Sequence, residues 1–202
     1  MALNFANNNS LSAITSLPAS ISGGGMTLIS TQTASSSSTI SFTSGIDSTY
    51  DEYVFKFYDI HPATNNAGLS FNASVNGGSS YGVSKTTTAF RSYHDESNSE
   101  AALEYDSGQD LQDSTASFQK ILRFIGNGND ESGVGSLHLF SPSSSTFVKH
   151  FIAVGNTYYD GSHSFHDFTS GYFDTTSVIN AIQFKMSSGN IDSGVIKLYG
   201  IS

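Results

Sequence analysis

The segment 50–60, Tyr-Asp-Glu-Tyr-Val-Phe-Lys-Phe-Tyr-Asp-Ile, constrains the fold of this chain more than any other feature. Aromatic and β-branched residues dominate it, which is typical of a β-strand. Successive strand residues point to opposite faces, and here both faces carry apolar groups. This pattern predicts a central strand that is covered on both sides, or on one side by a neighbouring subunit. The two sets are Tyr53, Phe55 and Phe57 on one face, and Val54, Tyr58 and Ile60 on the other.

Shorter segments of similar composition recur along the chain, separated by Gly, Asn, Ser and Pro. We expect the turns at 76–78, 126–129 and 188–190 to close tight hairpins, because Gly and Asn tolerate positive φ. The stretch 110–125 also fits a helical period, but its second half is interpreted as a strand. About ten short strands with turns between them predict an all-β fold, an antiparallel β-sandwich of jelly-roll type over residues 26–202. The other expected strands are 26–33, 39–43, 69–75, 101–105, 118–125, 135–140, 147–154, 181–186 and 194–199.

Composition excludes several classes of function. The chain has no cysteine, so it forms no disulfide scaffold, thiolate metal site or cysteine nucleophile. It carries eight basic residues and a net charge of −9, which argues against a nucleic-acid partner. No apolar run approaches the roughly 18 residues of a membrane span, and the N-terminus lacks the features of a secretory signal. We therefore expect no nucleic-acid binding and no membrane insertion.

Residues 1–25 differ from the rest of the chain. The first 22 residues contain no acidic or basic side chain, and three glycines follow as a flexible joint. The spacing of Leu11, Ile14, Leu17 and Ile21 is compatible with a short amphipathic helix, although Pro18 would interrupt it. Two interpretations remain open: a disordered leader, or a docking arm that orders when these four side chains meet a partner.

The cluster 158–167, Tyr-Tyr-Asp-Gly-Ser-His-Ser-Phe-His-Asp, offers the best candidates for a binding site. We interpret it as a solvated loop. Tyr158, Tyr159 and His163 are the candidates for contact with a host glycan, because sugar sites use aromatic stacking and hydrogen bonds. The alternative is that these side chains pack on their own sandwich. His163 and His166 could also bind a metal ion, but their spacing places them on one face only in a helix.

Other motifs give weaker signals. Residues 78–82 match G-x-S-x-G, but that motif needs a strand that turns into a helix, and a hairpin is the better interpretation. Residues 127–133 lack the ligand order of a calcium loop, and the acidic run around 93–96 is interpreted as a solvated face. We expect no catalytic residue, no resident metal and no cofactor.

Four segments resemble a family of structural proteins from tailed bacteriophages of marine bacteria. They are 28–35, 45–53, 181–191 and the ending 193–201, Ser-Gly-Val-Ile-Lys-Leu-Tyr-Gly-Ile. The resemblance implies a component of the phage particle, made in the host cytoplasm, and provides no catalytic residues. It leaves open a head decoration protein, a head fibre and a tail fibre.

The arm, the glycine joint and one β-domain suit a module that is anchored to a larger particle through its N-terminus. Apolar groups on both faces of a strand suit a closed oligomer, and we expect a homotrimer. Its expected partners are other virion proteins of the capsid or tail. A receptor-binding module that recognises a host glycan is the alternative.

Overall fold

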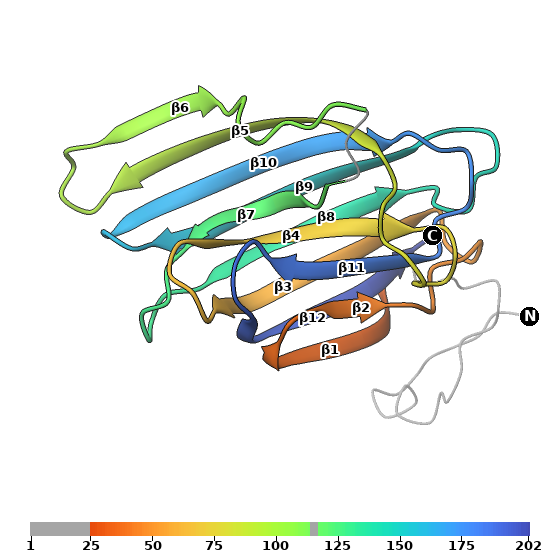
Figure 1. Cartoon of the computed structure of the whole chain (residues 1–202), viewed down its shortest axis with the longest axis horizontal. Helices are drawn as coiled ribbons and strands as arrows, with labels where there is room; N and C mark the ends of the chain where they lie inside the picture. The colour runs from red at the N-terminus through yellow and green to blue at the C-terminus, as the bar shows by residue number, and fades with distance from the viewer. Residues whose placement is uncertain (1–24, 114–116) are drawn as a thin grey trace, which may run out of the picture.

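The computed structural model describes residues 25–113 and 117–202, and their regular structure consists of strands in two antiparallel sheets packed as a sandwich. Figure 1 shows the smaller sheet in front of the larger one. The larger sheet has the order β1 (Thr27–Ser37), β12 (Ile191–Ile201), β3 (Glu52–Pro62), β8 (Gly133–Phe140), β9 (Lys149–Tyr159), β10 (His163–Phe173), β5 (Lys85–Asp95) and β6 (Ala101–Tyr105). The smaller sheet has the order β2 (Ile40–Phe42), β11 (Ala181–Met186), β4 (Ala67–Ser74) and β7 (Gln119–Ile125).

The connections follow a jelly roll. The chain changes sheet at each step from β2 to β5, again between β6 and β7, and again between β7 and β8. A simple jelly roll has one strand between those that correspond to β3 and β5, and here the meander β8–β9–β10 occupies that place. Beyond β3, β12 and β1 extend the larger sheet at the edge opposite β6. The all-β, jelly-roll-like sandwich expected from the sequence is confirmed. Residues 1–24, and with them the four docking candidates of the arm, lie outside the described residues.

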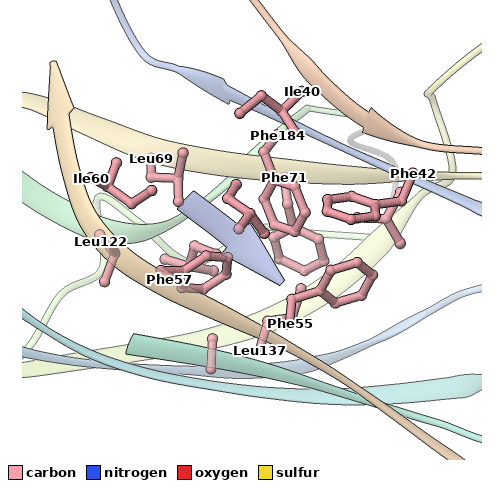
Figure 2. Close-up of a cluster of buried hydrophobic side chains, with 14 of the residues drawn as sticks. Ile40, Phe42, Phe55, Phe57, Ile60, Leu69, Phe71, Leu122, Leu137 and Phe184 are labelled. Atoms are coloured by element: carbon pink, nitrogen blue, oxygen red, sulfur yellow. The ribbon is translucent and has the colours of Figure 1, made fainter. Parts of the chain in front are cut away.

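The core lies between the two sheets and combines phenylalanine rings with isoleucine and leucine side chains (Figure 2). Phe184 of β11 is fully buried, and its ring centroid lies 5.2 Å from that of Phe55 and 5.4 Å from that of Phe57. Both contacts are edge-on, the geometry that aromatic quadrupoles favour. Ile182 and Met186 of β11 are buried in the same core, as the alternation along this strand requires.

A bulge in β3 changes one expectation. Asp59 has a φ of 49°, and the register of β3 against β8 shifts between Phe57 and Ile60. Ile60 therefore joins the core on the same side as Phe57, instead of lying on the other face with Tyr58. Tyr58 is 39% exposed, so the outward face of this strand is only partly covered within one chain.

Two strands were not expected, β5 and β10. Their inward positions include charged groups and hydroxyls, among them Lys85, Arg91 and Asp167, so the apolar alternation that marks a strand is missing. β1 is longer than the expected strand 26–33 and runs through most of the serine-rich segment 34–38. It can do so because its backbone pairs with β12 as far as Ser37.

Candidate functional site

The larger sheet is wider than the smaller one, so part of its inward face is uncovered. β7 is the last strand of the smaller sheet, whereas the larger sheet continues through β10 to β5 and β6 (Figure 1). Where β9 turns into β10, the uncovered face forms an open depression of about 330 Å³. We call it the aromatic depression. It is lined by Arg91, Tyr93, Glu100, Phe124, Tyr159, His163 and Phe165.

Aromatic rings form the floor of the aromatic depression. Phe165 of β10 is 7% exposed, and its ring centroid lies 5.1 Å from Tyr93, 5.3 Å from Phe124 and 5.4 Å from Tyr159. These separations are typical of favourable aromatic pairs. The rings come from three strands of the larger sheet and one of the smaller sheet, and they pack directly on one another.

Phe124 reaches the depression through a strained backbone. Its φ is 55°, which is rare for a bulky residue and costs on the order of 1–3 kcal/mol. The register between β4 and β7 shifts between Ala67 and Leu69, opposite this part of β7. The bulge turns Arg123 inward between the sheets and lets Phe124 meet the rings of the larger sheet.

A buried ion pair fixes the bulge. The backbone N–H of Arg123 donates to Asp167 Oδ2 at 2.8 Å, and Arg123 Nε donates to Asp167 Oδ1 at 2.5 Å. Arg123 also donates to Asp106 Oδ2 at 2.8 Å and to the carbonyl oxygen of Phe90 at 3.1 Å. Burial raises the pKa of Asp167, and the charge of Arg123 opposes that shift. This network anchors β7 against β10 and β5 beside the depression, two residues along β10 from Phe165.

Arg91 forms one wall of the depression. Its guanidinium carbon lies 5.0 Å from the ring centroid of Phe124 and 5.5 Å from that of Phe165. Its Nη2 lies 2.6 Å from Glu104 Oε1, so the positive charge is paired. Arg91 thus contributes a flat, paired surface, and the depression does not attract anions as an unpaired guanidinium would.

His163 and Glu100 form the polar rim. His163 Nδ1 lies 2.9 Å from the carbonyl oxygen of Gly161, so it donates its proton there. Its Nε2 lies 3.3 Å from Glu100 Oε2, the second polar group of the rim. The side chain of Glu100 is 65% exposed, so its carboxylate is also open to a ligand.

The arrangement combines flat apolar rings with a few hydrogen-bonding groups at one edge. A hexose has the complementary chemistry, because one side of its ring presents C–H groups and its edges present hydroxyls. At about 330 Å³ the depression is at the small end of ligand sites. It has room for a terminal sugar rather than a long chain.

The three residues predicted to contact a glycan lie on two different faces of the larger sheet. Tyr159 and His163 face each other across β9 and β10, with ring centroids 5.5 Å apart, and both line the depression. Tyr158 points to the opposite face of the sheet, where its hydroxyl lies 3.4 Å from Glu96 Oε1. The prediction missed Phe165 and Tyr93. The signal for Phe165 was its alternation with His163, once that segment is recognised as a strand, whereas Tyr93 lies on β5 and pairs with Phe165 across the sheet.

The interpretation of 158–167 as a solvated loop is wrong. β9 ends at Tyr159 and β10 begins at His163, so only residues 160–162 form the turn. Alternation along β10 places His163 and His166 on opposite faces, and they cannot share one ion. Over residues 25–113 and 117–202, no group of three or more His, Asp or Glu side chains is arranged to hold a metal.

The G-x-S-x-G match has a structural role in the connection between β4 and β5. Asn76 Nδ2 donates to Ser80 Oγ at 3.0 Å, and the Ser80 backbone N–H donates to Asn76 Oδ1 at 3.0 Å. The segment leads through extended chain into a strand and not into a helix. The connection joins the two sheets, so the hairpin expected here is also wrong.

Comparisons of the chain with models of known protein families, with curated proteins and with solved structures give no match. Within the described part of the chain, no helix is long and apolar enough to cross a membrane.

Proposed function

We propose that this protein is a non-enzymatic structural protein of a bacteriophage particle. It is displayed on the particle surface as a capsid decoration or fibre protein and anchored through residues 1–25. The resemblance of four segments to phage virion proteins supports this role most directly. Those segments lie in β1, before and at the start of β3, in β11 and in β12. β1, β12 and β3 are neighbours in the larger sheet, so most of the resemblance belongs to one structural unit.

The architecture is compatible with this role. The described residues form one sandwich, whose first strand begins two residues after Gly25, at the end of the glycine joint. Such a module can be attached through its N-terminus without any change to its core. We propose that it assembles as a homotrimer and contacts a capsid or tail protein through the arm.

Quantitative mass spectrometry of purified virions tests this role. Hundreds of copies per particle support a capsid decoration protein, and a few to a few tens support a fibre. Absence from purified particles overturns the proposal. A variant that lacks residues 1–22 should lose attachment while its circular dichroism stays that of the full chain. Attachment of the truncated protein overturns the docking role of the arm.

A second candidate function is recognition of a host glycan, which the aromatic depression favours. The adjacent tyrosines provide a matched test, because Tyr159 lies in the depression and Tyr158 points to the other face. Binding of the full chain to arrayed glycans and to host cells is compared for Tyr159→Ala and Tyr158→Ala. The first variant should lose about tenfold in affinity, equivalent to about 1.4 kcal/mol, and the second should bind like the wild type. Equal loss in both variants, or no binding by the wild type, overturns this function.

A further inference from the structure

The strands on the β6 side of the larger sheet have an unusual distribution of charge. β5, β6, β9 and β10 together carry six Asp, Glu, Lys or Arg side chains, and alternation with cross-strand pairing places all six on the inward face. A sheet that faces water normally has the opposite arrangement, with apolar groups inside and charged groups outside. The six are Lys85, Arg91, Asp95, Glu104, Lys149 and Asp167.

The outward face of β8, β9, β10, β5 and β6 contains no Asp, Glu, Lys or Arg. We call it the uncharged face. It consists of apolar and aromatic side chains, hydroxyls, histidines and one asparagine. The cross-strand row Ser136, Val154, Phe168, Phe90, Tyr105 is an example of this composition.

Several large apolar side chains on the uncharged face are open to solvent. Leu103 is 73% exposed, Tyr105 58%, Ile152 47% and Val134 42%. Phe90 is 40% exposed, and its ring stacks on that of Phe168 with centroids 4.6 Å apart and planes 8° apart. A contiguous exposed apolar surface of this kind is characteristic of an interaction site.

The uncharged face is also hollowed. An apolar depression of about 390 Å³ lies over β8, β9 and β10, and its lining includes Phe140, His150, Ile152 and Tyr172. Exposed apolar side chains beside an apolar hollow can pack against the same features of another molecule. The face therefore has both parts of a self-complementary contact.

We propose that the uncharged face is the interface between copies of this chain. The charge distribution argues for a second copy as the occupant. The chain has a net charge of −9, so two copies repel each other wherever their carboxylates meet. The uncharged face is an area where two copies can touch without bringing like charges together. A strongly charged partner would be matched by opposite charges on this face, but its five strands contribute no Asp, Glu, Lys or Arg, and at its edge His138 already lies 2.5 Å from Glu52 Oε1 of β3.

The size of the uncharged face is adequate for a stable contact. Five strands about 4.8 Å apart, with outward residues over roughly 30 Å of strand, give a projected area on the order of 700 Å². A corrugated surface has more accessible area than its projection. A standard interface uses about 800 Å² of accessible surface on each partner. The face can therefore form such an interface with one neighbour about a twofold axis; about a threefold axis it is divided between two neighbours, and each contact uses about half of it.

The test uses the purified full chain and does not depend on a virion, so it is separate from the test of the proposed function. Light scattering gives the mass of the wild type and of Leu103→Asp, Ile152→Asp and Phe147→Asp. Phe147 is the matched control, because it is 71% exposed and lies between strands, outside the uncharged face. We expect an oligomer for the wild type and for the control, and monomers of 21.4 kDa for the two face variants. A monomeric wild type, or face variants that assemble like the control, overturns the proposal.

A second measurement leaves the face apolar. Because the chain has no cysteine, Ile152→Cys and Phe147→Cys each carry one thiol. Alkylation of the first should be at least tenfold slower than that of the second at high protein concentration, and the difference should shrink on dilution. Equal rates at every concentration overturn the proposal.

Discussion

At the scale of the residue, the core leaves no room for a side chain at Gly155 of β9. A Cβ there would overlap Leu122 of β7 and lie 2.9 Å from the carbonyl oxygen of Val134. Leu122 is 1% exposed, so it cannot move aside without disturbing the core. We predict that Gly155→Ala lowers the free energy of unfolding by about 1–3 kcal/mol in denaturant titrations. Gly108→Ala is the control, because its Cβ would meet only Asp106 at an ordinary distance, and equal stability of the two variants would contradict the prediction.

Asp95 makes stability depend on pH at the turn from β5 to β6. Its carboxylate accepts hydrogen bonds from the hydroxyls of Ser97 and Ser99 and from the backbone N–H groups of Ser99 and Glu100. These bonds, the Ser97 hydroxyl first, hold the pKa of Asp95 well below its usual value. The ionised form is therefore favoured by folding, and its contribution is present above the unfolded pKa of about 3.9 and is lost as the pH falls below it.

Asp95→Asn tests this dependence. We predict that thermal unfolding at pH 6 occurs at a lower temperature in Asp95→Asn than in the wild type. The difference should shrink as the pH is lowered from about 4 to about 2, because the wild-type carboxyl is then progressively protonated in the unfolded chain while it stays ionised in the fold, which favours unfolding. Asp192→Asn serves as the control, since Asp192 is exposed and accepts one hydrogen bond, from the exposed Ser36 hydroxyl. A difference that stays constant down to pH 2 would rule out the carboxylate as its source.

At the scale of the element, the bulge of β7 depends on the Arg123–Asp167 pair. Arg123→Ala leaves a buried carboxylate without its partner, which we predict to cost about 3–5 kcal/mol of unfolding free energy. The double variant Arg123→Met with Asp167→Leu should recover most of this loss, since neither charge is then buried alone. Denaturant unfolding of both variants measures the difference. Equal destabilisation in the two would mean that the network, and not an uncompensated charge, determines the cost.

Most strands were predicted from the sequence, but the predictions of which consecutive strands form hairpins were wrong. Gly77, Gly78 and Gly189 do have positive φ, as the turn motifs required. Yet the connections at 76–78, 126–129 and 188–190 pass between the sheets, and the hairpins occur elsewhere, as at β9–β10. A residue with positive φ allows any reversal of the chain and does not specify whether the flanking strands pair.

Only part of the candidate site was predicted from the sequence, because that prediction also lacked the pairing of the strands. Tyr159 and His163 were found because aromatic and imidazole groups in a turn are conspicuous, and Tyr158 was included because it is adjacent in sequence. Alternation separates Tyr158 from the other two, but it applies only once β10 is recognised as a strand. Tyr93 and Phe124 lie on segments distant in the sequence: the pairing of β5 with β10 brings Tyr93 beside Phe165, and the packing of β7 against the larger sheet brings Phe124 there.

At the scale of the whole molecule, the charge distribution of β5, β6, β9 and β10 connects the fold with assembly. Their charged side chains lie on the inward face, and none lies on the uncharged face. Two of the inward charges are paired with opposite charges, Arg91 with Glu104 and Asp167 with Arg123 of β7, whereas Lys85 and Lys149 donate to backbone carbonyl oxygens. The outward residues of β8, β9, β10, β5 and β6 include no Asp, Glu, Lys or Arg, so burying the uncharged face against another copy incurs little cost of desolvating ions. The aromatic depression lies on the inward side of the same strands and stays open when the uncharged face is covered. One group of strands can thus support assembly on one side and ligand binding on the other.

The net charge of −9 gives this assembly a distinctive dependence on salt. Copies that meet through an uncharged face gain no ion pairs but still repel through the carboxylates on the rest of their surfaces. Raising the ionic strength from about 0.01 M to about 0.15 M shortens the Debye length from about 30 Å to about 8 Å and screens that repulsion. We predict that the association constant of the wild type rises several-fold over this range, measured by sedimentation velocity at pH 7. An interface held by ion pairs would weaken over the same range, so a fall in the association constant would locate the contact between copies on another, charged surface.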